Sequence, residues 1–346
     1  MKMFSRHGWL ILLICLTGMM PIIAREPVIL EEVLKPNGLA VGDRYIYVLE
    51  EPQILVFDRQ SLKLVKRFGR QGEGPQEFKT SATGLMPMIM YPFQGKLVVN
   101  SGSKVSFYSG DGRYLNEVKV APLSAYYPFG DGYISLGTVV NKSKSNKKVT
   151  VKVYLSIDLC DAKFNKITPL YQPGEPAAFN YPIPSYAFWG EEDKIFISSG
   201  KEDFLIMVFD QQGKPLYQIK KDFPPMEVTE AYKQQITDFF KNSPLTREYW
   251  KFYMKRIRFK KFFPAIRDML VRDSRIYAFT CKKKDEATQC IVMDLKGKEL
   301  NQVYLPFPES YGNFQYLYDV RDGYFFKLTE DEDEEVWQLE KIKIGN

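Results

Sequence analysis

One pattern recurs six times along the chain and constrains its fold more than any other feature. A turn residue leads into a short run of alternating apolar residues, a gap follows, and a second such run ends near an acidic or turn residue. The six copies begin at Asp43, Gly95, Asp131, Asp193, Ser274 and Asp322. Strands separated by such turns pair as antiparallel hairpins. Six copies of one hairpin unit predict a repeat architecture.

Each unit is expected to form one four-stranded blade. A single blade cannot bury both of its faces, so six blades must stack side by side around an axis. Residues 28–34 read as a further strand without a nearby partner. Because the sixth unit ends the chain, the simplest closure adds this early strand to the last blade and removes two exposed sheet edges. The prediction is an all-β, six-bladed β-propeller of four-stranded antiparallel blades, closed by an N-terminal strand.

A glycine-rich stretch, Phe68 to Phe78, lies between the first two units. Its three glycines and one proline forbid a helix and interrupt a strand, so we expect it to carry the chain from one blade to the next. It resembles the connector of NHL-type six-bladed propellers, whose repeats often end in Phe-Gly and a Gly-Pro-x-Glu-Phe turn. The resemblance to these exported, largely uncharacterised bacterial proteins spans about Val28 to Ile344. It implies a fold and not an activity.

The N-terminus has the plan of a secretory signal peptide. Lys2 and Arg6 precede an apolar run that ends at Met20 and is too short for a comfortable membrane span. Cleavage after Ala24 predicts a signal peptide, residues 1–24, and one domain, residues 25–346. Retention as an anchor is the alternative, and membrane contact is expected only through such an uncleaved segment. The expected location is extracytoplasmic: the periplasm, the cell surface or the medium.

Cysteine usage agrees with export. Cys281 and Cys290 flank a polar loop between two apolar runs, so the two thiols face each other if those runs pair. An oxidising compartment favours a disulfide between them, and two unpaired cysteines are the alternative. Cys160 is expected to be an ordinary buried thiol.

Histidine chemistry is excluded from the expected mature chain. His7 is the only histidine and lies in the segment expected to be removed. Without histidine the chain cannot run a Ser-His-Asp or Cys-His mechanism, and it lacks the common ligand of catalytic zinc. This argues against the zinc-dependent lyases of the NHL-type class. The chain also has no phosphate-binding Gly-x-x-x-x-Gly-Lys-Ser/Thr loop. We therefore name no catalytic residue and no metal ligand, and whether the chain is an enzyme stays open, with the balance against it.

Carboxylate chemistry is the remaining enzymatic hypothesis. Gluconolactonase-like propellers hold a divalent metal in the central channel, which implies a metal-dependent lactonase or esterase as the alternative function. Aspartates recur at one position of four units here: Asp43, Asp131, Asp193 and Asp322. Turn formation is the preferred interpretation, because aspartate bonds to nearby backbone. The acidic run at residues 330–335 is interpreted as a hairpin tip, with calcium or another divalent ion as the alternative. No cofactor is otherwise expected.

A helical insertion is predicted at about residues 226–263, between the fourth and fifth units. Thr229 caps the first helix and Thr246 starts the second, which has Tyr249, Phe252, Tyr253 and Ile257 on one side. Aromatic side chains alternate here with the cations Lys251, Lys255, Arg256, Arg258, Lys260 and Lys261. The preferred interpretation is an amphipathic cap on a propeller face. The functional alternative is a basic protrusion that docks an acidic polymer, an anionic surface or a protein, with Arg256, Arg258, Lys260 and Lys261 as candidate binding residues.

The functional hypothesis is an exported, non-catalytic binding or scaffolding module. Its ligand would be macromolecular, or a carbohydrate or peptide, and its partner an unidentified protein or polysaccharide bound by a monomer. Aromatic-rich segments at residues 126–129 and 171–186 could line such a groove, although packing between blades is the commoner fate. The net charge of +6 is modest, so nucleic acid is not expected as a partner.

Overall fold

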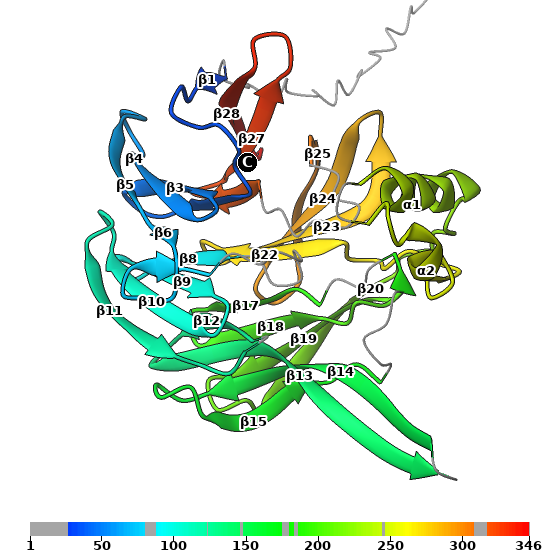
Figure 1. Cartoon of the computed structure of the whole chain (residues 1–346). Helices are drawn as coiled ribbons and strands as arrows, with labels where there is room; N and C mark the ends of the chain where they lie inside the picture. Colours follow the sequence, from blue (N-terminus) through cyan, green and yellow to red (C-terminus); the bar gives the residue numbers. More distant parts are fainter. Residues whose placement is uncertain are drawn as a thin grey trace, which may run out of the picture.

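The computed structural model describes residues 27–79, 88–122, 124–145, 148–174, 180–182, 186–243, 246–307 and 317–345. Six four-stranded antiparallel sheets form a ring, and the helices α1 and α2 lie outside it (Figure 1). This confirms the prediction of an all-β, six-bladed β-propeller. The predicted signal peptide lies outside the described residues. Among the residues that are described, no helix has the length and apolarity needed to cross a membrane.

Each predicted unit forms the second and third strands of a blade. Blade 1 consists of β2 (Gly38–Val41), β3 (Tyr45–Glu50), β4 (Gln53–Asp58) and β5 (Leu64–Phe68). Blade 2 consists of β8 (Ile89–Phe93), β9 (Lys96–Ser101), β10 (Lys104–Ser109) and β11 (Tyr114–Lys119). Blade 3 consists of β12 (Ala125–Phe129), β13 (Gly132–Ser145), β14 (Lys148–Cys160) and β15 (Lys166–Tyr171).

The second half of the ring repeats this order. Blade 4 consists of β17 (Phe188–Glu191), β18 (Lys194–Ser198), β19 (Phe204–Asp210) and β20 (Pro215–Lys221). Blade 5 consists of β22 (Asp268–Arg272), β23 (Arg275–Lys284), β24 (Ala287–Asp294) and β25 (Glu299–Leu305). Blade 6 consists of β26 (Tyr318–Arg321), β27 (Tyr324–Asp331), β28 (Val336–Lys343) and, as its outermost strand, β1 (Val28–Ile29).

The apolar runs are explained by burial on both faces of a blade. Alternate residues of a strand point to opposite faces, and in a ring both faces meet a neighbouring blade. In β3, Ile46 and Val48 pack in one cluster with Phe326 of blade 6. Tyr47 and Leu49 pack in another cluster with residues of blade 2. Apolar side chains at every position therefore stabilise the inner strands, whereas outermost strands such as β5 are largely exposed.

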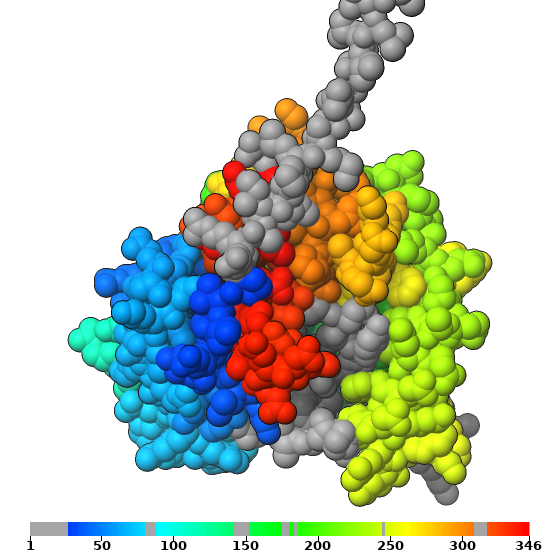
Figure 2. Space-filling view, turned by 90° about the horizontal axis from the view of Figure 1, so that it is seen from above, coloured from blue at the N-terminus to red at the C-terminus, as the bar shows by residue number. Residues whose placement is uncertain are grey.

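The ring is closed where the two ends of the described chain meet. β1 pairs antiparallel with β28, with Val28 opposite Leu339. Figure 2 shows the N-terminal residues lying against the C-terminal ones. The predicted strand over residues 28–34 shortens to two residues, because the chain turns away after Leu30. Leu30 and Val33 are instead buried in the cluster shared by blades 6 and 1.

The glycine-rich stretch connects blade 1 to blade 2, as predicted. Two short strands, β6 (Arg70–Gln71) and β7 (Glu77–Phe78), pair in parallel within it. Gly69 has a φ of +97°, and a Cβ there would lie 2.5 Å from the carbonyl oxygen of Pro52. Phe78 is fully buried in the cluster between the two blades. Lys104 of blade 2 donates hydrogen bonds to the carbonyl oxygens of Gly74 at 2.9 Å and Glu77 at 2.7 Å, which fixes the turn.

The helical insertion connects blades 4 and 5. In α1 (Glu230–Asn242), the Thr229 hydroxyl caps the helix by accepting a hydrogen bond from the Tyr232 nitrogen at 3.1 Å, as predicted. The second helix, α2 (Trp250–Met254), begins later than predicted. The Thr246 hydroxyl donates to the carbonyl oxygen of Phe240 at 2.9 Å, which ties a turn to the end of α1 instead of starting a helix. After α2, β21 (Arg258–Phe259) pairs in parallel with β16 (Asn180–Tyr181) and secures the insertion to the loop before blade 4.

Blade 3 carries a long arm. β13 and β14 stay paired as far as Ser145 and Lys148. The resulting two-stranded ribbon projects beyond the ring (Figure 1). The β-branched residues of the returning strand favour the extended conformation, which explains why the hairpin continues.

Candidate functional site

The recurrent aspartates lie in turns between the first and second strands of their blades and do not converge on the channel. Asp43 of blade 1 forms an ion pair with Arg321 of blade 6, and Asp322 forms one with Arg59 of blade 1. Asp193 pairs with its neighbour Lys194, and Asp131 is exposed. Among the described residues, no group of three or more histidine, cysteine or acidic side chains could hold a metal ion. No observation therefore favours the metal-dependent hydrolase.

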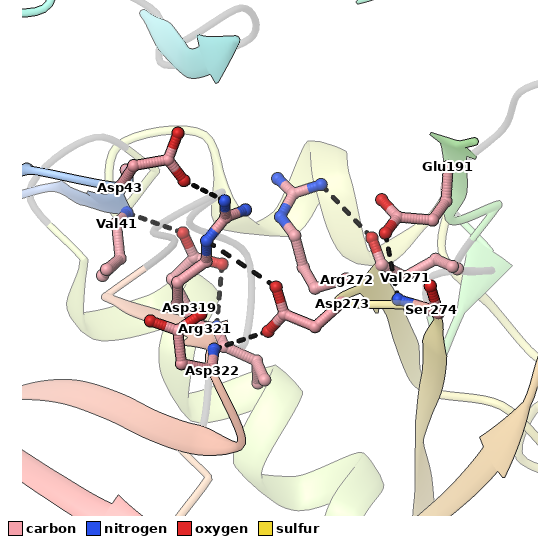
Figure 3. A network of polar contacts seen from close by, with 12 residues as sticks. Val41, Asp43, Glu191, Val271, Arg272, Asp273, Ser274, Asp319, Arg321 and Asp322 are labelled. Atoms are coloured by element: carbon pink, nitrogen blue, oxygen red, sulfur yellow. Dashed lines mark hydrogen bonds and ion pairs between the residues drawn. The ribbon is translucent and has the colours of Figure 1, made fainter. Parts of the chain in front are cut away.

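Charged side chains in these turns instead form ion pairs between neighbouring blades. Arg321 contacts Asp43 on one side, and its Nε lies 3.7 Å from an Asp273 carboxylate oxygen of blade 5 on the other (Figure 3). The Asp273 carboxylate also accepts a hydrogen bond from the backbone nitrogen of Asp322. These ion pairs and this hydrogen bond thus link blades 5, 6 and 1.

The channel itself holds a cluster that sequence reasoning missed. Arg272 is buried, with its guanidinium 4.0 Å from the centre of the Trp189 ring and its Nη1 3.0 Å from the Tyr127 hydroxyl. Tyr127 also packs edge-on against Tyr91, with ring centroids 5.0 Å apart. The sequence signal that could have revealed it is a charged residue that directly follows a short apolar run, as Arg272 follows Met269–Val271. These aromatic rings fill the space between four blades, so we interpret the cluster as packing.

One buried carboxyl group at a blade seam has a strongly altered pKa. Desolvation raises the pKa of Asp268 from its usual 3.8 to about 7, against the opposing effects of the Met269 backbone hydrogen bond and the Arg267 charge. The hydroxyl of Tyr318 in blade 6 donates to this carboxyl group, which lies at the start of blade 5. Asp268 therefore links two blades and titrates near neutrality.

The disulfide that the sequence allowed is not formed. Phe279 pairs with Cys290, and a register shift follows before Lys283 pairs with Thr288. This irregularity takes Cys281 out of line with Cys290. The Cys281 thiol lies 3.5 Å from the carbonyl oxygen of Pro264, while Cys290 is fully buried between blades 5 and 6. Cys160 is a buried thiol, as predicted.

The positive charge of the protein is concentrated in the insertion. Residues 241–261 contain eight lysine or arginine residues and a single acidic one, Glu248, whereas the entire 346-residue chain has a net charge of only +6. The rest of the chain is therefore close to neutral. Most of these cations are exposed: Lys241, Arg247, Lys251, Lys255, Arg256, Arg258 and Lys261.

The four candidate binding residues lie together on this segment but differ in their contacts. The Arg256 guanidinium stacks on Phe252, 3.4 Å from the ring centre. Arg258 is exposed in β21, and Lys260 is partly buried, with its backbone nitrogen 2.7 Å from the Tyr181 carbonyl oxygen. The Lys261 ammonium lies 3.9 Å from a Glu227 carboxylate oxygen. Arg256 and Arg258 are thus the more available of the four.

The aromatic side chains of the insertion divide into two groups. Tyr253 and Ile257 pack around a small core made by Tyr181, Ile236 and Phe240, a cluster formed within the insertion and the loop before blade 4 and not against a propeller face. Tyr249 and Phe252 were expected on the same side, but they are 62% and 51% exposed. The reason is that α2 has only five residues and starts at Trp250, so Tyr249 precedes the helix and Phe252 faces outward. We define the insertion surface as Tyr249, Lys251, Phe252, Lys255, Arg256 and Arg258.

Two other sequence-based candidates are structural. Residues Tyr126, Tyr127 and Phe129 are buried in β12, which supports the packing interpretation, whereas residues 175–179 and 183–185 lie outside the described part. The acidic run forms the tip between β27 and β28, as predicted. A cavity of about 530 Å³ lies at the seam of blades 6 and 1, but the Asp43, Arg59 and Asp322 side chains at its wall are already engaged in ion pairs.

No family model matches this chain, and no curated protein matches it. Among solved structures it is similar to Kluyveromyces lactis Hsv2, with a TM-score of 0.39 and 10% identity over 90% of this chain and 100% of that one. It is also similar to the Neurospora crassa Pan2 WD40 domain, with a TM-score of 0.43 and 9% identity over 89% of each chain. A luciferin-regenerating enzyme gives a TM-score of 0.40 and 9% identity over 92% of this chain and 95% of that one. These similarities are too low to indicate a function, and the NHL-type assignment stays a resemblance.

Proposed function

We propose that this chain is an exported, non-catalytic propeller that serves as a binding or scaffolding module and binds a macromolecular ligand through the insertion surface. One observation carries the proposal. The chain has 47 tyrosine and phenylalanine residues. Among the exposed large apolar side chains of the described residues, Tyr249 and Phe252 are the aromatic ones. Both lie in the segment that concentrates the positive charge.

Exposing an aromatic side chain to water is unfavourable in free energy, and burying it in an interface is favourable. Burying a side chain of this size typically contributes about 1.5–3 kcal/mol. Aromatic residues and arginine are enriched at the centres of protein interfaces, where a few such residues supply most of the binding energy. The pair Tyr249 and Phe252, with Arg256 stacked on the latter, has this composition.

The charge indicates the chemistry of the ligand. A surface with several exposed cations attracts anionic partners over a distance set by the salt concentration. The ligand therefore carries negative charge, as an acidic protein, a polysaccharide with carboxylate or phosphate groups, or an anionic surface does. Because the sequence predicts an export signal, we propose that protein and ligand meet outside the cytoplasm.

The proposal is tested with immobilised polygalacturonate and polyglutamate as acidic polymers. We expect residues 25–346 to be retained at low salt and released as salt rises. The double variant K251E/K255E should elute much earlier than the unaltered protein. The control K63E/K66E makes the same charge change on exposed lysines at the outer edge of blade 1 and should elute less early. Equal retention of the two double variants, or no retention of the unaltered protein, would refute the proposed surface.

A further inference from the structure

We infer that the insertion surface docks this protein on an anionic phospholipid bilayer. The inference rests on the proposed function and names the partner of that site. Its basis is that the exposed aromatic side chains and the exposed cations occupy one outer lobe of the molecule, which is the combination that interfacial membrane binding requires.

The cations supply the attraction. Each lysine or arginine close to an anionic membrane surface raises the binding constant about fivefold, within the range of screening by salt. Lys251, Lys255 and Arg258 are exposed, and Glu248 is the sole acidic residue between positions 241 and 261. Several such cations attract the protein to the bilayer, where the apolar side chains can then make contact.

The exposed aromatic pair, Tyr249 and Phe252, adds an apolar contribution to membrane binding that charge alone does not provide. Phe252 has no hydrogen-bonding group, so its side chain gains nothing from a hydrated polyanion and gains by leaving water. Arg256 covers one face of this ring at 3.4 Å from its centre. An arginine can bury its stem beside apolar groups while its guanidinium stays at the level of the phosphates. The Tyr249 ring, with its hydroxyl, suits the boundary between acyl chains and head groups.

The shape favours an extended partner. Small molecules bind in concave sites, whereas the insertion forms an outer lobe of the molecule (Figures 1 and 2). The 530 Å³ cavity lies elsewhere, at the seam of blades 6 and 1. A projecting lobe can reach a flat bilayer before the ring does.

The lobe is also held in place before it binds. Ile236 and Phe240 of α1 are buried against Tyr181 and the partly buried side of α2. The parallel pair of β16 and β21 joins the lobe to the ring, with Asn180 opposite Arg258. A preorganised surface loses little conformational freedom on binding, which strengthens weak contacts.

The test measures co-sedimentation of residues 25–346 with vesicles. One set is phosphatidylcholine alone, and the other is an equal mixture of phosphatidylcholine and phosphatidylglycerol. We expect binding to the anionic vesicles and little binding to the neutral ones. K251E/K255E should lower the partition constant about thirtyfold or more, because two cations are lost and two anions are added. Y249S/F252S should lower it at least about tenfold, because two apolar contacts are lost.

Matched control variants make the same kinds of substitution on the propeller, away from the insertion. K63E/K66E alters two exposed lysines near blade 1, and L115S/L300S alters two exposed apolar residues on outer strands. Both should bind more tightly than the corresponding insertion variants, and L115S/L300S should bind like the unaltered protein. Circular dichroism and the denaturation midpoint establish that every variant is folded.

The outcomes separate this inference from the proposed function. Binding to polygalacturonate without binding to anionic vesicles overturns the bilayer inference and leaves the proposed function standing. Vesicle binding that Y249S/F252S leaves unchanged also overturns the inference, since charge would then act alone. Binding to neither polymer nor vesicle overturns both.

Discussion

The Asp319 carboxylate of blade 6 accepts a hydrogen bond from the Val41 backbone nitrogen of blade 1 at 2.7 Å, across 278 residues of sequence. This contact joins the innermost strands of the first and last blades, while β1 pairs with β28 at the outer edge of blade 6. The second Asp319 oxygen accepts from the Val320 nitrogen at 2.8 Å. Burial raises the pKa of Asp319, against the charge of Arg272 and these backbone hydrogen bonds. The ring is thus closed both near its axis and at its rim.

Asp319→Ala should therefore destabilise the ring. The change leaves the Val41 nitrogen buried without its acceptor, and a buried unsatisfied group costs about 1–3 kcal/mol. The free energy of unfolding, measured by urea denaturation, should fall by at least this amount. Asp43→Ala removes an exposed ion pair and should cost less than about 1 kcal/mol. Equal losses for the two variants would show that the inner contact does not close the ring.

Replacing the buried Asp268 should change how stability depends on pH. Its folded pKa is raised from 3.8 to about 7, so between these values the folded state binds the proton and the unfolded state does not. Stability contributed by this group is present at low pH and is lost as pH rises toward 7, by at most about 1.4 kcal/mol per pH unit.

Asp268→Asn cannot ionise and should remove this loss. Relative to the unaltered protein, the variant should become more stable as pH rises from about 4 to 7 and show no further relative gain above that range. Denaturation midpoints measured across this range check the prediction. A stability difference that is constant with pH would contradict the raised pKa.

The connector should be intolerant of a side chain at Gly69. An alanine Cβ there would lie 2.5 Å from the Pro52 carbonyl oxygen and 2.6 Å from the Phe78 ring, in a backbone conformation with φ of +97°. We expect Gly69→Ala to cost more than about 2 kcal/mol. Gly95→Ala is the control, because Gly95 also has a positive φ of +72° but nothing lies within 4 Å of its Cβ position. That variant should show the backbone penalty alone, about 1 kcal/mol. If both variants lose the same unfolding free energy, the loss at Gly69 comes from its backbone conformation and not from a clash with Pro52 and Phe78.

The short closing segment should contribute through its buried side chains. Leu30 is 2% exposed and lies in the cluster shared by blades 6 and 1, whereas Leu34 is 69% exposed. Leu30→Ala should lower the free energy of unfolding by about 2–5 kcal/mol. Leu34→Ala should change it by less than about 0.5 kcal/mol. Chemical denaturation followed by circular dichroism compares the two, and similar values would contradict the assigned packing.

Local patterns predicted the repeat and its closure but not every element boundary. The alternating runs from Tyr45 and Ile276 lie in β3 and β23, because burial on both faces leaves a clear apolar signal. Thr229 was recognised as a cap because its role depends on the next three residues. Thr246 was misassigned because its hydroxyl bonds back to Phe240, a contact that depends on how the chain turns after α1. The sequence left open whether Cys281 and Cys290 form a disulfide, because an irregularity in strand pairing leaves no mark in it.

The sequence by itself determined the number of blades, the connector and the concentration of positive charge, because each depends on residue type and spacing along the chain. Only the tertiary structure decided which side chains meet across the ring and which remain exposed. The Asp319 carboxylate accepts a hydrogen bond from the Val41 nitrogen, which no local pattern predicted. Tyr249 and Phe252 are exposed, although their helical spacing suggested that they would be buried. The physical reason is that burial and long-range pairing depend on neighbours brought together by folding, and residues close in sequence do not specify them.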